Sequence, residues 1–386
     1  MIRKEQAGFT LMETMVALVI LLGVSAVVMS GMVQMMTTQG TIANRTEMHT
    51  SVRAVTELLQ QEIGQAGKIS LPQPLPGVAW AMTTAVPAGV TPDTPVTINA
   101  ATFNVADPVT GNPLLFEGEW VTVDTGAPTC VPLQVACQET VQLTCAAGIG
   151  NCPAPSFTWR ATFNYTHTPI PIAIPGIVTV GVPISLPGSF GTGIIPPAAG
   201  VMAAPPAGYA GYPVWPVNAP AKGSSGTVLK LYGDINGDGN MVYIEYTCVP
   251  GNPAAPGFLY RNQVPWTAVA MPPLDPSMIV LTNVLANPNA ANANAVPCFT
   301  YQLRTSDGLN AAINDMAFVT DVAVTLTVQT ANKDPQTHIF QQETKALLNV
   351  SPRNVYNAYE FATLEYRNRI QPTPLNIKGT ILPNFQ

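Results

Sequence analysis

Residues 8–33 read GFTLMETMVALVILLGVSAVVMSGMV, and Glu13 is the only ionisable side chain among them. A helix rises about 1.5 Å per residue, so a helix from Phe9 to Val33 would span roughly 37 Å, enough to cross a hydrocarbon core of about 30 Å. A carboxylate near the bilayer centre costs about 2.5–3.5 kcal/mol on insertion scales. The stretch therefore predicts a membrane-spanning helix in which Glu13 has a purpose.

Cleavage at Gly8 would leave this helix in the mature protein. A short leader, residues 1–8, precedes the helix and contains the basic residues Arg3 and Lys4. A secretory signal peptide places its small cleavage-site residue after the apolar run, whereas Gly8 lies before it. An ordinary signal anchor that contains a glutamate is the alternative interpretation.

The arrangement resembles the type IV prepilin signature, which has a basic leader, glycine before the cut, phenylalanine after it and glutamate as the fifth mature residue. The resemblance implies that a prepilin peptidase on the cytoplasmic side cleaves between Gly8 and Phe9 and methylates the new amine. It also implies that Glu13 pairs with the amino terminus of a neighbouring Phe9 in a filament, where a charge that is costly in lipid becomes paired.

The apolar run continues into an amphipathic helix, which is predicted over residues 9–67 and ends near Gly64 to Gly67, before Pro72. The mid-helix proline of many pilins is missing, since Ser30 occupies that region. The second half should lay an apolar stripe against a globular head. The stripe comprises Ile42, Met48, Val52, Val55, Leu59 and Ile63. The charged residues on other faces are Arg45, Glu47, Arg53, Glu57 and Glu62.

Beyond Lys68 the pattern changes to short strands separated by Pro, Gly and Asn. A long helix followed by many strands predicts an α+β fold, with an antiparallel β-rich head over residues 68–355 and a C-terminal extension over residues 356–386. The clearest strand begins at Val319 and alternates apolar and polar residues, as an antiparallel strand with one wet face does. The expected strands are 96–105, 115–123, 140–144, 157–163, 227–232, 241–248, 258–261, 299–303, 319–330 and 338–350.

Residues 161–226 form a Pro-, Gly- and Ala-rich insertion in the head. No charged side chain occurs between Arg160 and Lys222, and Ile and Val are frequent there. The Ile and Val content argues against simple disorder. We therefore expect an insertion that covers one edge of the sheet or contacts another subunit, with a mobile surface loop as the alternative.

Four cysteines cluster in the head: Cys130, Cys137, Cys145 and Cys152. They are separated by six or seven residues, which does not match the C-x2-C pairs of zinc sites, so disulfides are favoured over a metal. Three pairings are open within the cluster. We favour Cys130 with Cys137 and Cys145 with Cys152, which would staple two short loops.

Cys248 and Cys298 lie outside this cluster and pair by elimination. Their disulfide would close a long span of the chain and stabilise the head by a few kcal/mol in the chain-entropy model. An even number of cysteines fits an oxidising compartment, as expected for a head outside the cytoplasm.

Residues 234–240 read DINGDGN and, with Glu245, satisfy the calcium-loop pattern D-x-[DN]-x-[DN]-G-x5-E. The flanking sequence is β-rich rather than helical. The alternative interpretation is therefore a hairpin turn without a metal, since Asn-Gly and Asp-Gly are favoured hairpin residues. The candidate Ca²⁺ ligands are Asp234, Asn236, Asp238, the Asn240 carbonyl and, as a poorer candidate, Glu245.

Neither nucleic-acid binding nor catalysis finds support. The formal net charge is -6, and the basic residues are scattered singly rather than in runs interleaved with aromatics. His49, His167 and His338 lie far apart, and satisfied core histidines are favoured over catalytic ones. No catalytic motif occurs, and prolines follow the Gly-rich residues 188–193, which prevents the helix that a phosphate loop needs. We therefore expect no enzymatic activity and, calcium aside, no cofactor.

Two further segments are similar to minor pilins of the PilW type: residues 53–67, and the two strands from Val319 that end in SPRN at 351–354. The similarity is strong over residues 1–67, moderate over 314–355 and weak between. It implies a minor pilin that sits in the inner membrane with its head in the periplasm, and then joins other minor pilins at an assembly platform to start a type IV pilus or remain at its tip. A type II secretion pseudopilin and a tip adhesin are the alternatives.

Overall fold

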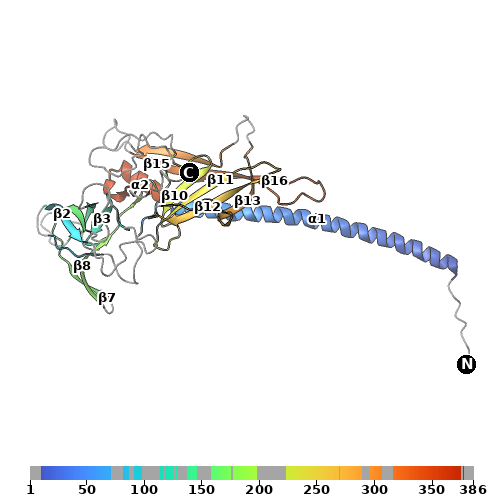
Figure 1. The fold of residues 1–386 in the computed structure, drawn as a ribbon, viewed down its shortest axis with the longest axis horizontal. Coiled ribbons are helices and arrows are strands. Elements are labelled where there is room, and N and C mark those ends of the chain that lie inside the picture. Colours follow the sequence, from blue (N-terminus) through green and yellow to red (C-terminus); the bar gives the residue numbers. More distant parts are fainter. Residues whose placement is uncertain are drawn as a thin grey trace, which may run out of the picture.

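The computed structural model describes residues 10–70, 81–86, 91–97, 114–116, 118–125, 127, 137–145, 158–174, 177–197, 223–268, 270–288, 296–306, 316–374 and 377. In these residues a single long helix, α1 (Leu11–Gln65), leads into a β-rich head, from which its N-terminal half projects as a rod (Figure 1). The predicted α+β fold is confirmed. α1 is continuous over 55 residues, as the absence of an internal proline predicts.

The larger sheet of the head has seven antiparallel strands in the order β10-β11-β12-β13-β15-β14, with β16 also paired to β15. The apolar face predicted for the Val319 strand is confirmed, since Val322, Val324, Leu326 and Val328 are all buried. The strands are β10 (Val228–Gly233), β11 (Val242–Val249), β12 (Gly257–Pro265), β13 (Ile279–Leu285), β14 (Phe299–Ser306), β15 (Met316–Gln329) and β16 (Gln342–Val350).

The second half of α1 covers one face of this sheet. Two predictions for the helix are wrong. Ile42 is 59% exposed, because the buried part of α1 begins only at Met48. Glu62 is 5% exposed rather than solvated, because Arg261 and Tyr246 on the sheet pair with its carboxylate. The rest of the predicted stripe is buried in one core with the sheet: Met48, Val52, Val55, Leu59 and Ile63.

α1 ends where two segments of backbone cross. Gly67 has φ +81°, in the left-handed region that favours glycine. A Cβ on Gly193 would lie 2.2 Å from the Gly67 Cα atom, so only glycine permits this crossing. The Asn354 side-chain amide donates to the carbonyls of Gln65 (3.1 Å) and Ala66 (3.3 Å), which caps the C-terminal end of α1.

A second lobe with its own apolar core lies at the end of the head away from the N-terminal half of α1 (Figure 1). The insertion predicted over 161–226 contributes regular strands to it, which the Pro/Gly-rich composition did not indicate; residues 198–222 lie outside the described part. Its five-stranded sheet comprises β1 (Ala81–Met82), β3 (Trp120–Val123), β4 (Glu139–Gln142), β7 (Ile170–Ile174) and β8 (Ile177–Ser185). Its three-stranded sheet comprises β2 (Thr91–Thr97), β5 (Thr144–Cys145) and β6 (Thr158–Phe163).

The C-terminal segment packs on the head through α2 (Arg353–Thr363), which crosses the boundary predicted between residues 355 and 356. α2 buries Val355 and Ala358 in a small core with Phe318 and Ile370. Two short strands, β9 and β17, pair in parallel near it. The remaining elements are β9 (Ser189–Phe190), η1 (Pro276–Met278), η2 (Arg367–Arg369) and β17 (Ile370–Gln371).

Eight of the ten expected strands overlap observed strands over most of their length. The expected strand at 115–123 overlaps β3 over residues 120–123. The expected strand at 96–105 overlaps β2 only up to Thr97, and its remainder lies outside the described residues. The expected strand at 338–350 begins at Gln342, because His338 adopts φ +57° in the preceding turn. Among the described residues, the strands that the sequence reasoning missed are β7, β8 and β13 and the two-residue strands β1, β9 and β17.

Candidate assembly site on the N-terminal helix

Glu13 lies in the first turn of α1 and forms a capping box with the N-cap residue Thr10. The Thr10 N–H donates to Glu13 Oε2 (3.1 Å), and the Glu13 N–H donates to Thr10 Oγ1 (3.4 Å). A carboxylate at this position also interacts favourably with the helix dipole. Within the described chain its partner is therefore local. Gly8 and Phe9 lie outside the described residues, so cleavage between them and the pairing of Glu13 with a Phe9 amine stay predictions.

The half of α1 that contains Glu13 is exposed throughout. Every residue from Thr10 to Met36 is exposed, and the most apolar part of the helix is 0% buried. The exposed side chains include Leu11 at 78% and Val27 at 73%. This half is long and apolar enough to cross a membrane, by length and composition. An apolar surface of this extent marks a contact with lipid or with another protein.

A polar stripe on α1 marks where the helix reaches the head. Thr41 Oγ1 donates to Asp334 Oδ1 (3.2 Å) in the turn between β15 and β16. About two helical turns further along α1, His49 Nδ1 lies 2.5 Å from Glu343 Oε2 on β16. The His49 side chain is 57% exposed, so this pair contributes little to stability. These polar contacts orient α1 on the head, and the apolar core that begins at Met48 stabilises its attachment.

Glu62, Arg261 and Tyr246 form a buried polar anchor between α1 and the sheet. Glu62 Oε1 accepts from Arg261 Nη2 (2.5 Å) and Nε (2.9 Å), while Glu62 Oε2 accepts from the Tyr246 hydroxyl (2.5 Å). Burial, and then the negative charge of Glu62, raise the pKa of Tyr246, which keeps its hydroxyl a donor. Because β11 and β12 both contact Glu62, the anchor fixes the rotation of α1 about its axis.

The calcium-like loop connects β10 to β11. Asp234 is 1% exposed; its Oδ2 lies 3.0 Å from Lys68 Nζ, and its Oδ1 accepts from the Gly239 N–H (3.3 Å). Glu245 lies along β11, where its Oε1 is 3.4 Å from Lys230 Nζ. Among the described residues, no three His, Cys, Asp or Glu side chains are grouped so as to hold a metal. The Lys68 ammonium thus neutralises the most buried candidate ligand, which favours the hairpin turn without a metal over a calcium site.

We expect millimolar Ca²⁺ to leave the melting temperature of the full chain unchanged. Lys68 already pairs with Asp234, and the other candidate ligands of the turn, Asn236, Asp238 and Asn240, are exposed. Thermal unfolding in detergent micelles, with Ca²⁺, with Mg²⁺ and with a chelator, measures this. A rise of several degrees with Ca²⁺ alone would instead establish the loop as a calcium site.

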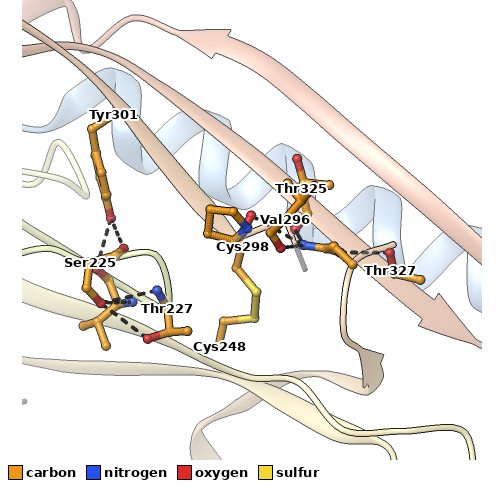
Figure 2. Close-up of a disulfide and its surroundings, with 11 residues drawn as sticks. Ser225, Thr227, Cys248, Val296, Cys298, Tyr301, Thr325 and Thr327 are labelled. Atoms are coloured by element: carbon orange, nitrogen blue, oxygen red, sulfur yellow. Dashed lines mark hydrogen bonds between the residues drawn. A yellow bond between two sulfur atoms is a disulfide. The ribbon is translucent and has the colours of Figure 1, made fainter. Parts of the chain in front are cut away.

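The disulfide between Cys248 and Cys298 is confirmed and joins β11 to the residue before β14 (Figure 2). Both cysteines are buried in the core beneath α1. Cys137 is also buried and disulfide-bonded. Cys130 and Cys152 lie outside the described residues, so the pairings within the cluster stay predictions.

Residues 3–32 match the family model of the prokaryotic N-terminal methylation motif. The N-terminus thus carries a prepilin-type motif. The match includes residues 3–8 of the leader, Glu13 and the exposed start of α1, and it supports a type IV pilin-like, membrane-associated protein that prepilin peptidase processes. Proteins with this motif are generally structural rather than catalytic. Comparison with curated proteins found no match, and neither did comparison with solved structures.

Sequence reasoning missed several side chains that position α1. The Thr10 cap has a readable signal, since Thr10 and Glu13 have the S/T-x-x-E spacing of a capping box. Glu62 directly precedes Ile63 and follows Leu59 by three residues, which places it at the border of the apolar stripe. Lys68 carries no such signal, because its partner Asp234 is far away in the sequence.

Proposed function

We propose that this chain is a minor pilin of a type IV pilus, held in the inner membrane by α1 before assembly and drawn into the filament afterwards. The observation that carries the proposal is the exposed apolar half of α1, which directly follows the processing motif and contains one carboxylate. Lipid covers this surface before assembly, and neighbouring helices cover it in the filament. Glu13 then pairs with the amine of a neighbouring Phe9.

The size of the head supports a minor role. Beyond the sheet that α1 covers, the head carries a second lobe with a separate core. A head this bulky is hard to repeat at every position of a helical lattice. We place the chain with other minor pilins in the complex that initiates assembly or stays at the tip. Before assembly its head lies in the periplasm, and afterwards it lies on the cell surface.

Immunogold labelling of sheared pili, beside a secretion assay in a deletion strain, tests this function. We expect label on the pili, and we expect the deletion strain to lose pili while secreting normally. Loss of secretion with pili intact would establish a type II secretion pseudopilin instead. Intact pili and secretion with loss of surface attachment would establish an adhesin.

A further inference from the structure

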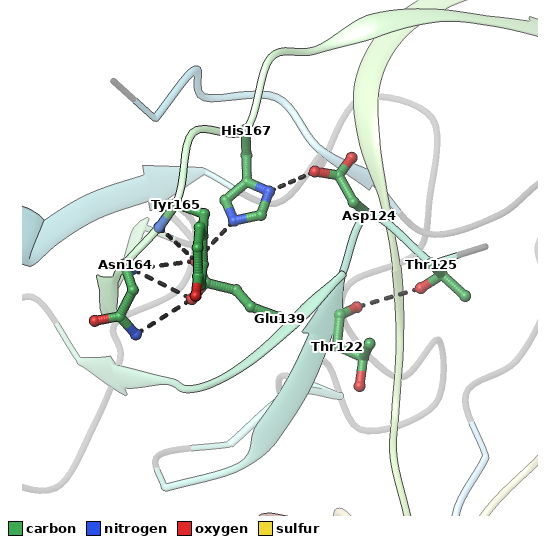
Figure 3. A network of polar contacts seen from close by, with 7 residues as sticks. All are labelled: Thr122, Asp124, Thr125, Glu139, Asn164, Tyr165 and His167. Carbon is green, nitrogen blue, oxygen red and sulfur yellow. Dashed lines mark hydrogen bonds and ion pairs between the residues drawn. The ribbon is translucent and has the colours of Figure 1, made fainter. Parts of the chain in front are cut away.

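Three side chains that the assembly site does not use meet in the second lobe (Figure 3). Asp124 follows β3, Glu139 begins β4, and His167 lies between β6 and β7. His167 is 0% exposed. Its Nε2 lies 2.7 Å from Glu139 Oε1, and its Nδ1 contacts Asp124 Oδ2. Each ring nitrogen therefore faces a carboxylate oxygen.

With both carboxylates ionised, this geometry requires a hydrogen on both nitrogens of the His167 ring. A neutral imidazole carries only one N–H, so its other nitrogen would present a lone pair to a carboxylate. Glu139 is held as an acceptor by further donors, the N–H groups of Asn164 (3.2 Å) and Tyr165 (3.3 Å). The cluster is thus built around an imidazolium with two anionic partners.

Two anionic side chains face the His167 ring. Among the described residues, Asp124 and Glu139 are the charged side chains that contact the ring. β6 contributes the Phe163 ring, whose centroid lies 5.5 Å from that of the imidazole. The segment after β1 contributes two backbone hydrogen bonds: the Val86 N–H donates to the His167 carbonyl (2.8 Å), and the His167 N–H donates to the Val86 carbonyl (3.1 Å). Loss of one proton from His167 would therefore leave the two carboxylates without a cation.

We propose that Asp124, Glu139 and His167 form a proton-dependent latch, which holds the second lobe together while the imidazole is doubly protonated and loosens it when one proton is lost. The latch joins the ends of β3, β4 and β6 to the segment around Val86. Removing one partner of a buried, hydrogen-bonded charge cluster is strongly destabilising, and deprotonation removes the shared cation. The latch does not depend on assembly into a filament.

The direction of the pH response follows from both groups. Burial alone would lower the pKa of His167, but its hydrogen bonds to Glu139 and Asp124 outweigh burial and raise it. Its stabilisation is therefore complete below the unfolded value of about 6.5 and is lost as the pH rises through the higher folded pKa. Burial alone would raise the pKa of Glu139, but its bonds to His167 and Asn164 lower it. Its stabilisation is present above the unfolded value of about 4.3 and is lost as the pH falls through the folded pKa.

Hydrogen exchange of the full chain in detergent micelles, followed by mass spectrometry across pH, tests the latch. Exchange at the ring C2 position gives the titration of each histidine. We expect His167 to titrate above the ordinary histidine value of about 6.5. Between the unfolded value of about 6.5 and the folded pKa of His167, amide exchange in residues 137–145 and 158–167, corrected for its intrinsic rate, should rise by up to tenfold per pH unit, and above that pKa it should level off. Exchange in β11 should show no such rise.

The matched variants are His167→Gln and His49→Gln, since both remove a histidine that faces a carboxylate. His167→Gln should abolish the pH dependence of exchange in the second lobe, and His49→Gln should leave it unchanged. The latch is overturned if His167 titrates at or below the ordinary value, or if His167→Gln keeps the wild-type pH dependence. The wild-type titration decides the question even where the variant does not fold.

Discussion

Replacing Glu13 with Ala should leave membrane insertion and leader cleavage intact but lower incorporation into filaments by roughly ten- to hundredfold. The apolar half of α1 becomes more apolar in the variant, so insertion is not impaired. A hydrogen bond to a charged group contributes about 1.5–3 kcal/mol, and each 1.4 kcal/mol is a factor of ten. Immunoblots of the sheared-pilus and membrane fractions measure the ratio of assembled to membrane-held protein.

Thr10→Ala is the control for this experiment, because it removes the capping box and keeps the carboxylate. The lost cap costs about 1 kcal/mol at one helix end, so we expect a smaller defect than for Glu13→Ala. Equal defects would mean that Glu13 acts through capping alone. Normal incorporation of Glu13→Ala would refute the pairing with a neighbouring amine and leave the membrane anchor as the sole role of this helix half.

Glu62→Ala should lower the free energy of unfolding of the head by about 3–5 kcal/mol, because it leaves the mostly buried guanidinium of Arg261 without its carboxylate partner. The Arg261 side chain is only 20% exposed, and Tyr246 loses its acceptor in the same variant. Denaturant unfolding of the full chain in micelles, followed by tryptophan fluorescence, measures the change. Such a loss is a large fraction of the total stability of a typical domain.

Glu57→Ala is the matched control, since Glu57 lies on the same helix and pairs with Arg53 at 2.8 Å, with side chains 57% and 81% exposed. Exposed pairs of this kind contribute about 0.3–0.5 kcal/mol. Replacing both Glu62 and Arg261 with Leu should cost less than Glu62→Ala, because no buried charge is left. If Glu62→Ala costs no more than Glu57→Ala, the buried anchor does not stabilise the head.

Local patterns predict the helix and most of the strands of this protein. Five of the six residues that the period of α1 assigns to the apolar stripe are buried, and the alternation in β15 identifies its apolar buried face. α2 has a readable pattern as well, since Val355, Ala358 and Ala362 follow helical spacing. The predicted boundary between the head and the C-terminal extension, at residues 355 and 356, instead falls within this helix. β7 and β8 carry almost no alternation, and prolines within them suggest loop.

The functional residues also differ in how far the sequence alone identifies them. Gly8, Phe9 and Glu13 form a contiguous motif, so the sequence alone is sufficient to single them out. Glu62 and His167 depend on partners from distant strands, and their burial becomes visible only when those strands are in place. For Glu62 the sequence indicates only a position at the border of the apolar stripe, and for His167 no sequence signal separates a solvated position from a paired one.

The crossing at the end of α1 has a mechanical consequence. The helix has 55 residues, so it forms a stiff rod of roughly 80 Å that enters the head alongside the sheet. A pulling force on the N-terminal end of α1 would act as a shear force between α1 and the strands on which it packs. At the C-terminal end of α1, the backbone of Gly67 packs closely against Gly193, and the Asn354 side chain donates a hydrogen bond to the carbonyl of Gln65. Sliding of the helix along the sheet would have to break these contacts together with the shared apolar core, so we expect a pulling force to be distributed between the end of α1 and the strands beneath it.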